Sequence, residues 1–133
     1  MINTLSSERG LAPLHIACVD HEWDVVSQLL QHGADVKARS AFGSTVLHLC
    51  CEGEWEQVIE ALLANKADVE APDHQGQTPL LMASKTGRRD IVTSLLAAGA
   101  EVNRRDNAGT CALSLSCRSE DGTLARLLLQ HGA

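Results

Sequence analysis

The chain has 133 residues, the length of one domain, and a formal net charge of −6 at pH 7. This acidic balance disfavours nonspecific binding to nucleic acid, which requires a basic surface. The sequence contains no apolar run of about 18 residues that would predict a membrane span, and its first residues lack the pattern of a signal peptide. One phenylalanine, two tryptophans and no tyrosine are few for a single globular core, so small aliphatic side chains are expected to supply the core.

Two short motifs recur along the chain at a fixed spacing of 33 residues. The first is Gly-Leu-Ala-Pro-Leu-His at residues 10–15, and related segments occupy residues 43–48, 76–81 and 109–114. The second is Gly-Ala-Asp-Val at residues 33–36, with related segments at 66–69 and 99–102 and a final Gly-Ala at 132–133. A constant period of this length, without insertions, predicts an array of stacked structural repeats.

The period divides the chain into an initial segment at residues 1–6 and repeats at 7–39, 40–72, 73–105 and 106–133. The initial segment is either a short cap or the tail of an earlier repeat. The fourth repeat stops before its period is complete, and neither end resembles the polar capping repeats that such arrays need. We expect the chain to be a fragment of a longer protein.

The third repeat shows most clearly how each unit is expected to fold as turn, helix, short loop and second helix. Thr78 is predicted to cap the first helix, with Pro79 at the first helical position, where its missing N–H is tolerated. Gly87 is expected to end this helix, and a second helix is predicted over roughly residues 90–97. Gly99 then supplies the left-handed residue that stops the second helix.

Departures from the repeated pattern mark weaker positions. Ala12 replaces the capping threonine in the first repeat, and Lys66 stands where the other copies of the second motif have glycine. The fourth repeat has lost both proline and histidine, since Ala112 and Ser114 occupy those positions. It is therefore expected to be the least stable unit, with its last helix over residues 123–130.

These motifs resemble the ankyrin repeat, whose pattern has a period of about 33 residues and a Thr-Pro-Leu-His motif. The resemblance covers residues 7–133. It implies an all-α solenoid of stacked helix-turn-helix units joined by projecting, hairpin-like turns. It also implies a protein-interaction module, such as a scaffold or adaptor, although fold alone does not identify the partner.

The cysteines are predicted to be structural. Cys18, Cys51 and Cys117 occupy one equivalent position on the first helices, where small buried side chains are expected, and Cys50 lies beside this position. None of the five cysteines, Cys111 included, has the paired spacing of a zinc site. Free thiols in this number favour a reducing compartment, the cytoplasm or nucleus.

His15 and His48 recur at one position of the repeat. They could form a metal or catalytic pair, but the resemblance implies hydrogen bonds to the turn backbone of their own and the next repeat. The sequence shows no phosphate-binding loop, no dinucleotide motif and no framework for a catalytic triad. We therefore expect no enzyme activity, no metal and no cofactor.

The resemblance places the binding surface on the projecting turns and the exposed side of the first helices. The residues it implies are Arg39, Phe42, Ser44, Glu52, His74, Gln75, Gln77, Lys85, Arg105, Asn107, Thr110 and Arg118. Because six basic residues tend towards this side, a monomer that binds an acidic protein or peptide is expected. The six are Lys37, Arg39, Lys85, Arg104, Arg105 and Arg118. The alternatives are that these charges only solvate the surface, that the chain is an architectural spacer, or that an enzyme site goes unrecognised.

Two residues of this surface carry separate expectations. Phe42 is predicted at the tip of a turn, with Arg39 and Arg105 nearby, in the composition of a binding hot spot. Asn103 closes a segment similar to the ankyrin segment that an iron- and 2-oxoglutarate-dependent asparaginyl hydroxylase modifies. It would then be a substrate for hydroxylation, whereas the alternative is an asparagine that serves the turn.

Overall fold

The computed structural model describes residues 13–51, 56–118 and 122–133, which form two compact units, Met1–Asp68 and Val69–Ala133. Among these residues there are eight helices and no strand, only an isolated antiparallel bridge between Arg105 and Cys111. The prediction of an all-α fold is confirmed. Over the same ranges, none of the helices combines the length and the apolar character needed to cross a lipid bilayer.

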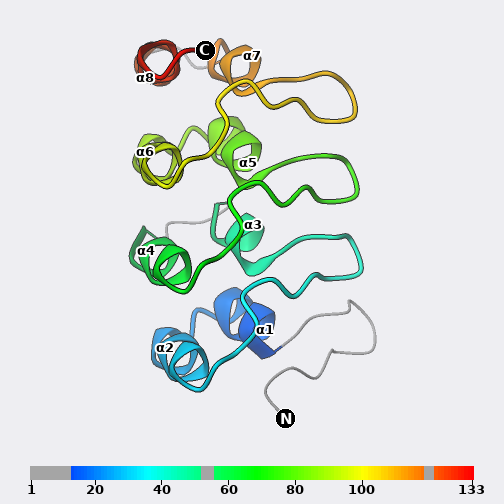
Figure 1. Cartoon of the computed structure of the whole chain (residues 1–133), viewed down its shortest axis with the longest axis vertical. Coiled ribbons are helices and arrows are strands. Elements are labelled where there is room, and N and C mark those ends of the chain that lie inside the picture. Colours follow the sequence, from blue (N-terminus) through cyan, green and yellow to red (C-terminus); the bar gives the residue numbers. More distant parts are fainter. Residues whose placement is uncertain (1–12, 52–55, 119–121) are drawn as a thin grey trace. The chain divides into compact units, whose positions relative to one another are not determined.

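The first unit contains α1 (Pro13–Val19), α2 (Trp23–Gln31), α3 (Val46–Cys51) and α4 (Glu56–Ala64). Helix α1 packs against both α2 and α3, and α4 packs against both α3 and α2 (Figure 1). The first helices, α1 and α3, therefore lie side by side, as do the second helices, α2 and α4. Aliphatic side chains fill the space between them, and the most deeply buried are Leu14, Val26, Val46, Leu47, Ile59 and Leu62.

The second unit repeats this arrangement with α5 (Pro79–Thr86), α6 (Arg89–Ala97), α7 (Ala112–Ser116) and α8 (Thr123–Gln130). The first helices, α5 and α7, pack side by side, and the second helices, α6 and α8, do the same (Figure 1). Leucine and isoleucine again dominate the interior, where Leu80, Ile91, Leu95, Leu124 and Leu128 are buried. The small aliphatic core expected from the composition is present in both units.

Helix ends follow the local signals of the sequence. The Thr78 side chain accepts a hydrogen bond from the Leu81 amide at 3.4 Å, and Pro79 begins α5. Gly87 closes α5 in the left-handed conformation with φ of 75°. Helix α6 begins at Arg89, one residue before the predicted start, and Gly99 follows it with φ of 94°. Each of these predicted helix ends is confirmed.

One structural prediction is wrong. Cys18 and Cys51 are buried as expected, but Cys117, at the equivalent position, is exposed. Helix α7 ends at Ser116, so Cys117 is its C-cap and lies beyond the packed face. The short helix agrees with the weak signals of the fourth repeat, which lacks the proline that begins α5. The cap substitution at Ala12 lies outside the described residues.

The turns before α5 and α7 are joined by two hydrogen bonds and approach each other closely at Gly76. The Asn107 amide nitrogen donates to the Gln75 carbonyl at 3.0 Å, and the Asn107 side chain donates to the His74 carbonyl at 3.2 Å. A methyl group on Gly76 would lie only 2.8 Å from the Asn107 amide nitrogen. Glycine is thus required here for close approach as well as for its φ of 77°.

Replacing Lys66 with glycine should stabilise the protein. Lys66 has φ of 64°, a conformation that is unfavourable for a residue with a β-carbon by about 1–2 kcal/mol. We expect Lys66→Gly to raise the free energy of unfolding by about 1 kcal/mol, measured by urea denaturation. The reverse change at the matching position, Gly33→Lys, should destabilise. A Lys66→Gly variant that melts at or below the parent would contradict this explanation.

The contact between the turns can be measured with a matched pair of alanine variants. Gly76 and Gly109 both have positive φ, of 77° and 81°, but a β-carbon at Gly109 meets no atom within 4 Å. Both variants should lose stability through backbone strain. Gly76→Ala should lose about 1 kcal/mol more, because its methyl group also forces Asn107 away. Equal losses in urea denaturation would show that the two turns do not support each other.

Candidate binding surface

The turns that precede α3, α5 and α7 have the same backbone hydrogen bonds. In each, the first residue donates its amide to the carbonyl of the fifth residue: Ser40 to Ser44 at 2.8 Å, Asp73 to Gln77 at 3.0 Å and Asp106 to Thr110 at 3.0 Å. The glycine at the fourth position then donates to the carbonyl of the first residue, at 2.9–3.0 Å. Three turns of different sequence are thus closed in the same way.

The side chain of the first residue holds each turn from inside. Asp73 Oδ1 accepts hydrogen bonds from the amides of Gln75 and Gln77, both at 2.9 Å. Asp106 binds Ala108 and Thr110 in the same way and at the same distances. Ser40 Oγ replaces the carboxylate in the first unit, with longer bonds of 3.2 and 3.3 Å, as expected for an uncharged acceptor.

The tips of these turns are exposed. The residues at the second and third positions are Ala41 and Phe42, His74 and Gln75, and Asn107 and Ala108, all of them on the surface. Phe42 is 68% exposed, more than any other large hydrophobic side chain that the structure describes. A constant backbone therefore presents a different pair of side chains at each turn.

The residues predicted to bind a partner fall into three groups. Eight are exposed: Arg39, Phe42, His74, Gln75, Lys85, Arg105, Asn107 and Arg118. Three that close the turns are only half-exposed: Ser44, Gln77 and Thr110. Glu52 lies outside the described residues.

Several predicted residues also have structural contacts. Arg105 Nη1 donates to the Gly109 carbonyl at 3.0 Å, and Asn107 binds the preceding turn as described above. Asn103 is exposed, and its side-chain amide donates to the Gly132 carbonyl at 3.3 Å. This bond joins Asn103 to a residue 29 positions further along the chain, and hydroxylation of Asn103 stays a prediction.

On the exposed side of the first helices, each unit carries apolar side chains at one position of the repeat, which sequence reasoning missed. Ile16 on α1 is 39% exposed, and Leu49 on α3 is half-buried. Met82 on α5 and Leu115 on α7 hold the equivalent positions in the second unit and are half-buried as well. All four stand 33 residues apart, so the period itself was a signal that could have found them.

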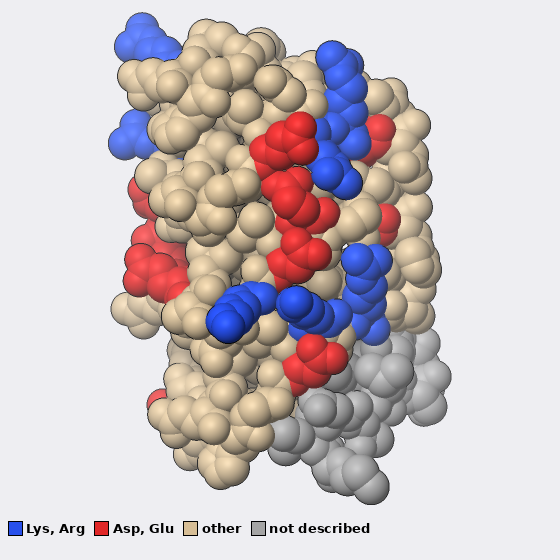
Figure 2. Space-filling view, in the orientation of Figure 1, with Lys and Arg blue, Asp and Glu red and all other residues tan. Residues whose placement is uncertain are grey.

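Basic residues follow these apolar positions in the second unit. Lys85 follows Met82 by three positions within α5, which places it one helical turn away on the same side. Arg118 follows Leu115 by three positions and lies two residues beyond the end of α7. Both are exposed. Arg104, in contrast, lies within 3.7 Å of both Glu70 and Glu101 and is compensated by them. Figure 2 shows such acidic and basic side chains next to one another on the face that carries the loops.

The two recurrent histidines are bound to turns. His15 Nε2 donates to the Ser44 carbonyl at 3.1 Å, which confirms the predicted bond to the next turn. His48 Nδ1 accepts the Thr45 amide hydrogen at 3.1 Å, within its own turn. Burial lowers the pKa of His15, although the hydrogen bond to Ser44 opposes this effect. Both rings therefore support the positions of the first helices.

The thiol of Cys50 is buried beside that of Cys18. A hydrogen bond with Cys18 and burial together raise the pKa of Cys50, so its thiol stays protonated at neutral pH. A protonated, buried thiol is neither a good nucleophile nor a metal ligand. Within the described parts of the chain, no three His, Cys, Asp or Glu side chains are grouped to hold a metal ion.

Comparison with known proteins identifies the family. The family model described as ankyrin repeats (3 copies) matches residues 14–106 and, in a second match, residues 75–133. The chain therefore belongs to the ankyrin-repeat family, and the predicted ankyrin fold is confirmed. A comparison with curated proteins gives no match. Ankyrin repeats are generally protein–protein interaction modules, which sets the class of function.

The lowered pKa of His15 makes a specific contribution to pH-dependent stability. The unfolded chain binds a proton at this histidine near pH 6.5, whereas the folded chain binds it only at lower pH. The contribution of His15 is thus present above pH 6.5 and is lost as the pH falls through the folded pKa. Between pH 7 and 5, the His15→Gln variant should lose less stability than the parent in urea denaturation. An equal loss would contradict the assignment.

Proposed function

We propose that the chain binds a partner protein through its turn tips and the exposed side of its first helices. The observation that carries this proposal is the shared hydrogen bonding of the turns, which holds dissimilar side chains at fixed exposed positions. Turn closure does not depend on the residues at the second and third positions, because it uses their backbone amides and the flanking residues. Apart from Asn107, whose side-chain amide binds the preceding turn, these side chains are consequently available for recognition.

A preformed surface suits binding because little order has to be gained on association. Each turn contains two backbone hydrogen bonds and two bonds to the side chain of its first residue. Ordering a flexible loop on binding would oppose association, whereas a turn held in this way avoids most of that penalty. The same reasoning applies to the first helices, whose opposite sides are buried.

The chemistry of the surface favours a partner with apolar and acidic side chains. In the second unit, Met82 and Leu115 present apolar area beside Lys85 and Arg118. In the first unit, the exposed ring of Phe42 lies three residues from the exposed Arg39. Apolar anchors beside basic side chains are a common composition of interface hot spots, and the positive charges would steer an acidic partner.

The proposal also includes a cellular compartment and has one competing role. The buried thiols of Cys18 and Cys50 are reduced, which supports a reducing compartment, the cytoplasm or nucleus. The competing role is an architectural spacer, in which the turn tips contact nothing. The roles differ in one measurable respect, since only a binding module loses affinity when an exposed turn residue is removed.

Phe42→Ala should separate binding from folding. Because the ring is 68% exposed, its removal should change the free energy of unfolding by less than about 0.5 kcal/mol. Affinity for a partner should fall by about 1–2 kcal/mol, or roughly five- to thirtyfold. The partner would first be isolated from lysate with the parent chain, and its affinity for the purified variants would then be measured by calorimetry.

The control is Gln75→Ala, which removes a polar side chain at the equivalent position of another turn. It should leave stability unchanged and reduce affinity less than Phe42→Ala does. Unchanged affinity of Phe42→Ala for a validated partner would remove Phe42 from the interface. A large loss of stability would instead place the ring in the fold.

A further inference from the structure

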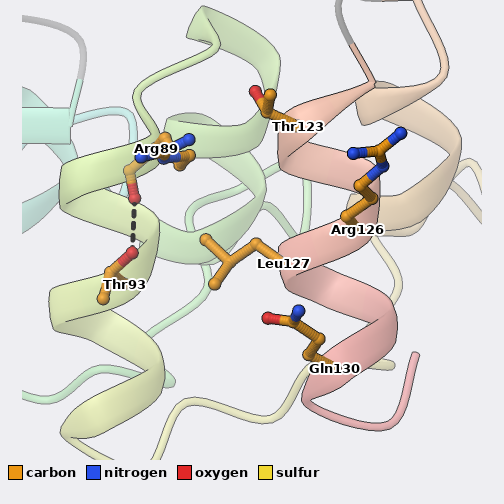
Figure 3. Close-up of a pocket in the computed structure, with 6 residues that line it drawn as sticks. All are labelled: Arg89, Thr93, Thr123, Arg126, Leu127 and Gln130. Carbon is orange, nitrogen blue, oxygen red and sulfur yellow. Dashed lines mark hydrogen bonds between the residues drawn. The ribbon is translucent and has the colours of Figure 1, made fainter.

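The second unit also has an open groove between its two second helices. The surface proposed above does not include this groove. It lies between α6 and α8 and has a volume of about 370 Å³. Figure 3 shows Leu127 and Gln130 reaching from α8 towards α6, with Arg89 and Arg126 on opposite sides of the groove. Its lining consists of Arg89, Thr93, Thr123, Arg126, Leu127 and Gln130.

The lining residues follow from helical spacing. Arg89 and Thr93 are four residues apart on α6, and Thr123, Leu127 and Gln130 follow at steps of four and three on α8. Each set therefore forms one stripe along its helix. Leu127 is half-buried, whereas both arginines are exposed. The groove thus combines an apolar contact area with two guanidinium groups and the polar side chains of threonine and glutamine.

The charge of the groove is opposite to that of the whole chain. The chain has a net charge of −6, but among the residues that the structure describes the lining contains two arginines and no acidic residue. Helix α8 has no acidic residue at all, and α6 has only Asp90, which is outside the lining. Blue side chains accordingly lie along the edge formed by α6 and α8 in Figure 2.

The fold does not require arginine at these positions. The residue 33 positions before Arg89 is Glu56, and the residue 66 positions before Arg126 is Glu60. Both glutamates are exposed on α4, the corresponding second helix of the first unit. Because the same structural positions accept the opposite charge there, packing does not explain the two arginines of the groove.

We propose that this groove binds an acidic peptide segment of a partner protein. Two carboxylates of the segment would be held by Arg89 and Arg126, since guanidinium groups bind carboxylates with paired, charge-assisted hydrogen bonds. An apolar side chain between the carboxylates would contact Leu127. This site is on the second helices, whereas the surface proposed above uses turns and first helices, so the chain would have two separate interaction surfaces.

The test is an NMR titration of the whole, ¹⁵N-labelled chain with the blocked peptide Glu-Glu-Leu-Glu-Glu. Amide shifts should change on α6 and α8, chiefly near Thr93 and Leu127, with a dissociation constant of roughly 1 mM or tighter. The variant Arg89→Glu/Arg126→Glu, which copies the residues of α4, should weaken binding at least tenfold. The variant Arg89→Gln/Arg126→Gln should also weaken binding at least tenfold. It replaces the glutamate variant in the test if the charge reversal unfolds the chain.

A charge-matched control places the same change elsewhere. Lys85→Glu/Arg118→Glu alters the net charge equally, but on α5 and just beyond the end of α7, so the shifts on α6 and α8 should persist. This control also separates the two proposals. If the groove binds no peptide, the proposal for the turns and first helices is unaffected, and the reverse also holds. A blocked peptide in which lysine replaces glutamate should produce no shifts in the groove.

Three results would overturn the proposal. The first is an absence of shifts on α6 and α8, or shifts that centre on Lys85 and Arg118. The second is undiminished binding by both the glutamate and glutamine double variants. The third is an equal response to inorganic phosphate at the same ionic strength, which would show an adventitious ion only.

Discussion

Closure of the turn is the interaction on which the rest of each unit depends. The amide of the first turn residue bonds to the carbonyl of the fifth, and this short link sets where the following first helix begins. In the second unit, Asp73 and Asp106 reinforce the link with charge-assisted bonds. Each first helix then packs against its own second helix and against the neighbouring first helix. A helix of five residues such as α7 would not form alone, so the turn and these contacts maintain it.

The residues that support the fold are different from the residues that are exposed on its surface. Leucine, isoleucine, alanine and valine occupy the buried positions in both units, and the buried histidines bind turn backbone. The exposed positions vary freely: the third turn residue is phenylalanine, glutamine or alanine in successive turns. A scaffold that tolerates such variation can present different chemistry without changing its fold. This is the physical basis for the use of ankyrin repeats in protein interaction.

The same freedom extends to the second helices. Glutamates on α4 and arginines on α6 and α8 share structural positions, so surface charge is set repeat by repeat and not by the fold. Net charge alone therefore describes the molecule poorly. An acidic chain can carry a basic groove, provided that the charges stand on one stripe of neighbouring helices. Two interaction surfaces on different helices would allow one unit to contact two segments of a partner.

The sequence by itself determined the class of fold, the two ends of α5 and the left-handed position at Lys66. These features depend on residues that are adjacent along the chain. Thr78, Pro79 and Gly87 delimit α5 through local geometry, and the period shows that Lys66 stands in a glycine position. Repetition made these local signals stronger, because each was read from several copies.

Only the tertiary structure decided the contacts between residues about 30 positions apart. Asn107 reads as a turn residue of its own repeat, yet it binds His74 and Gln75 of the preceding turn. Arg104 reads as part of a basic surface, yet Glu70 compensates its charge. Cys117 reads as buried, yet α7 ends before it. The groove between α6 and α8 likewise exists only once the two helices are packed, because the depth and composition of a groove depend on side chains from both.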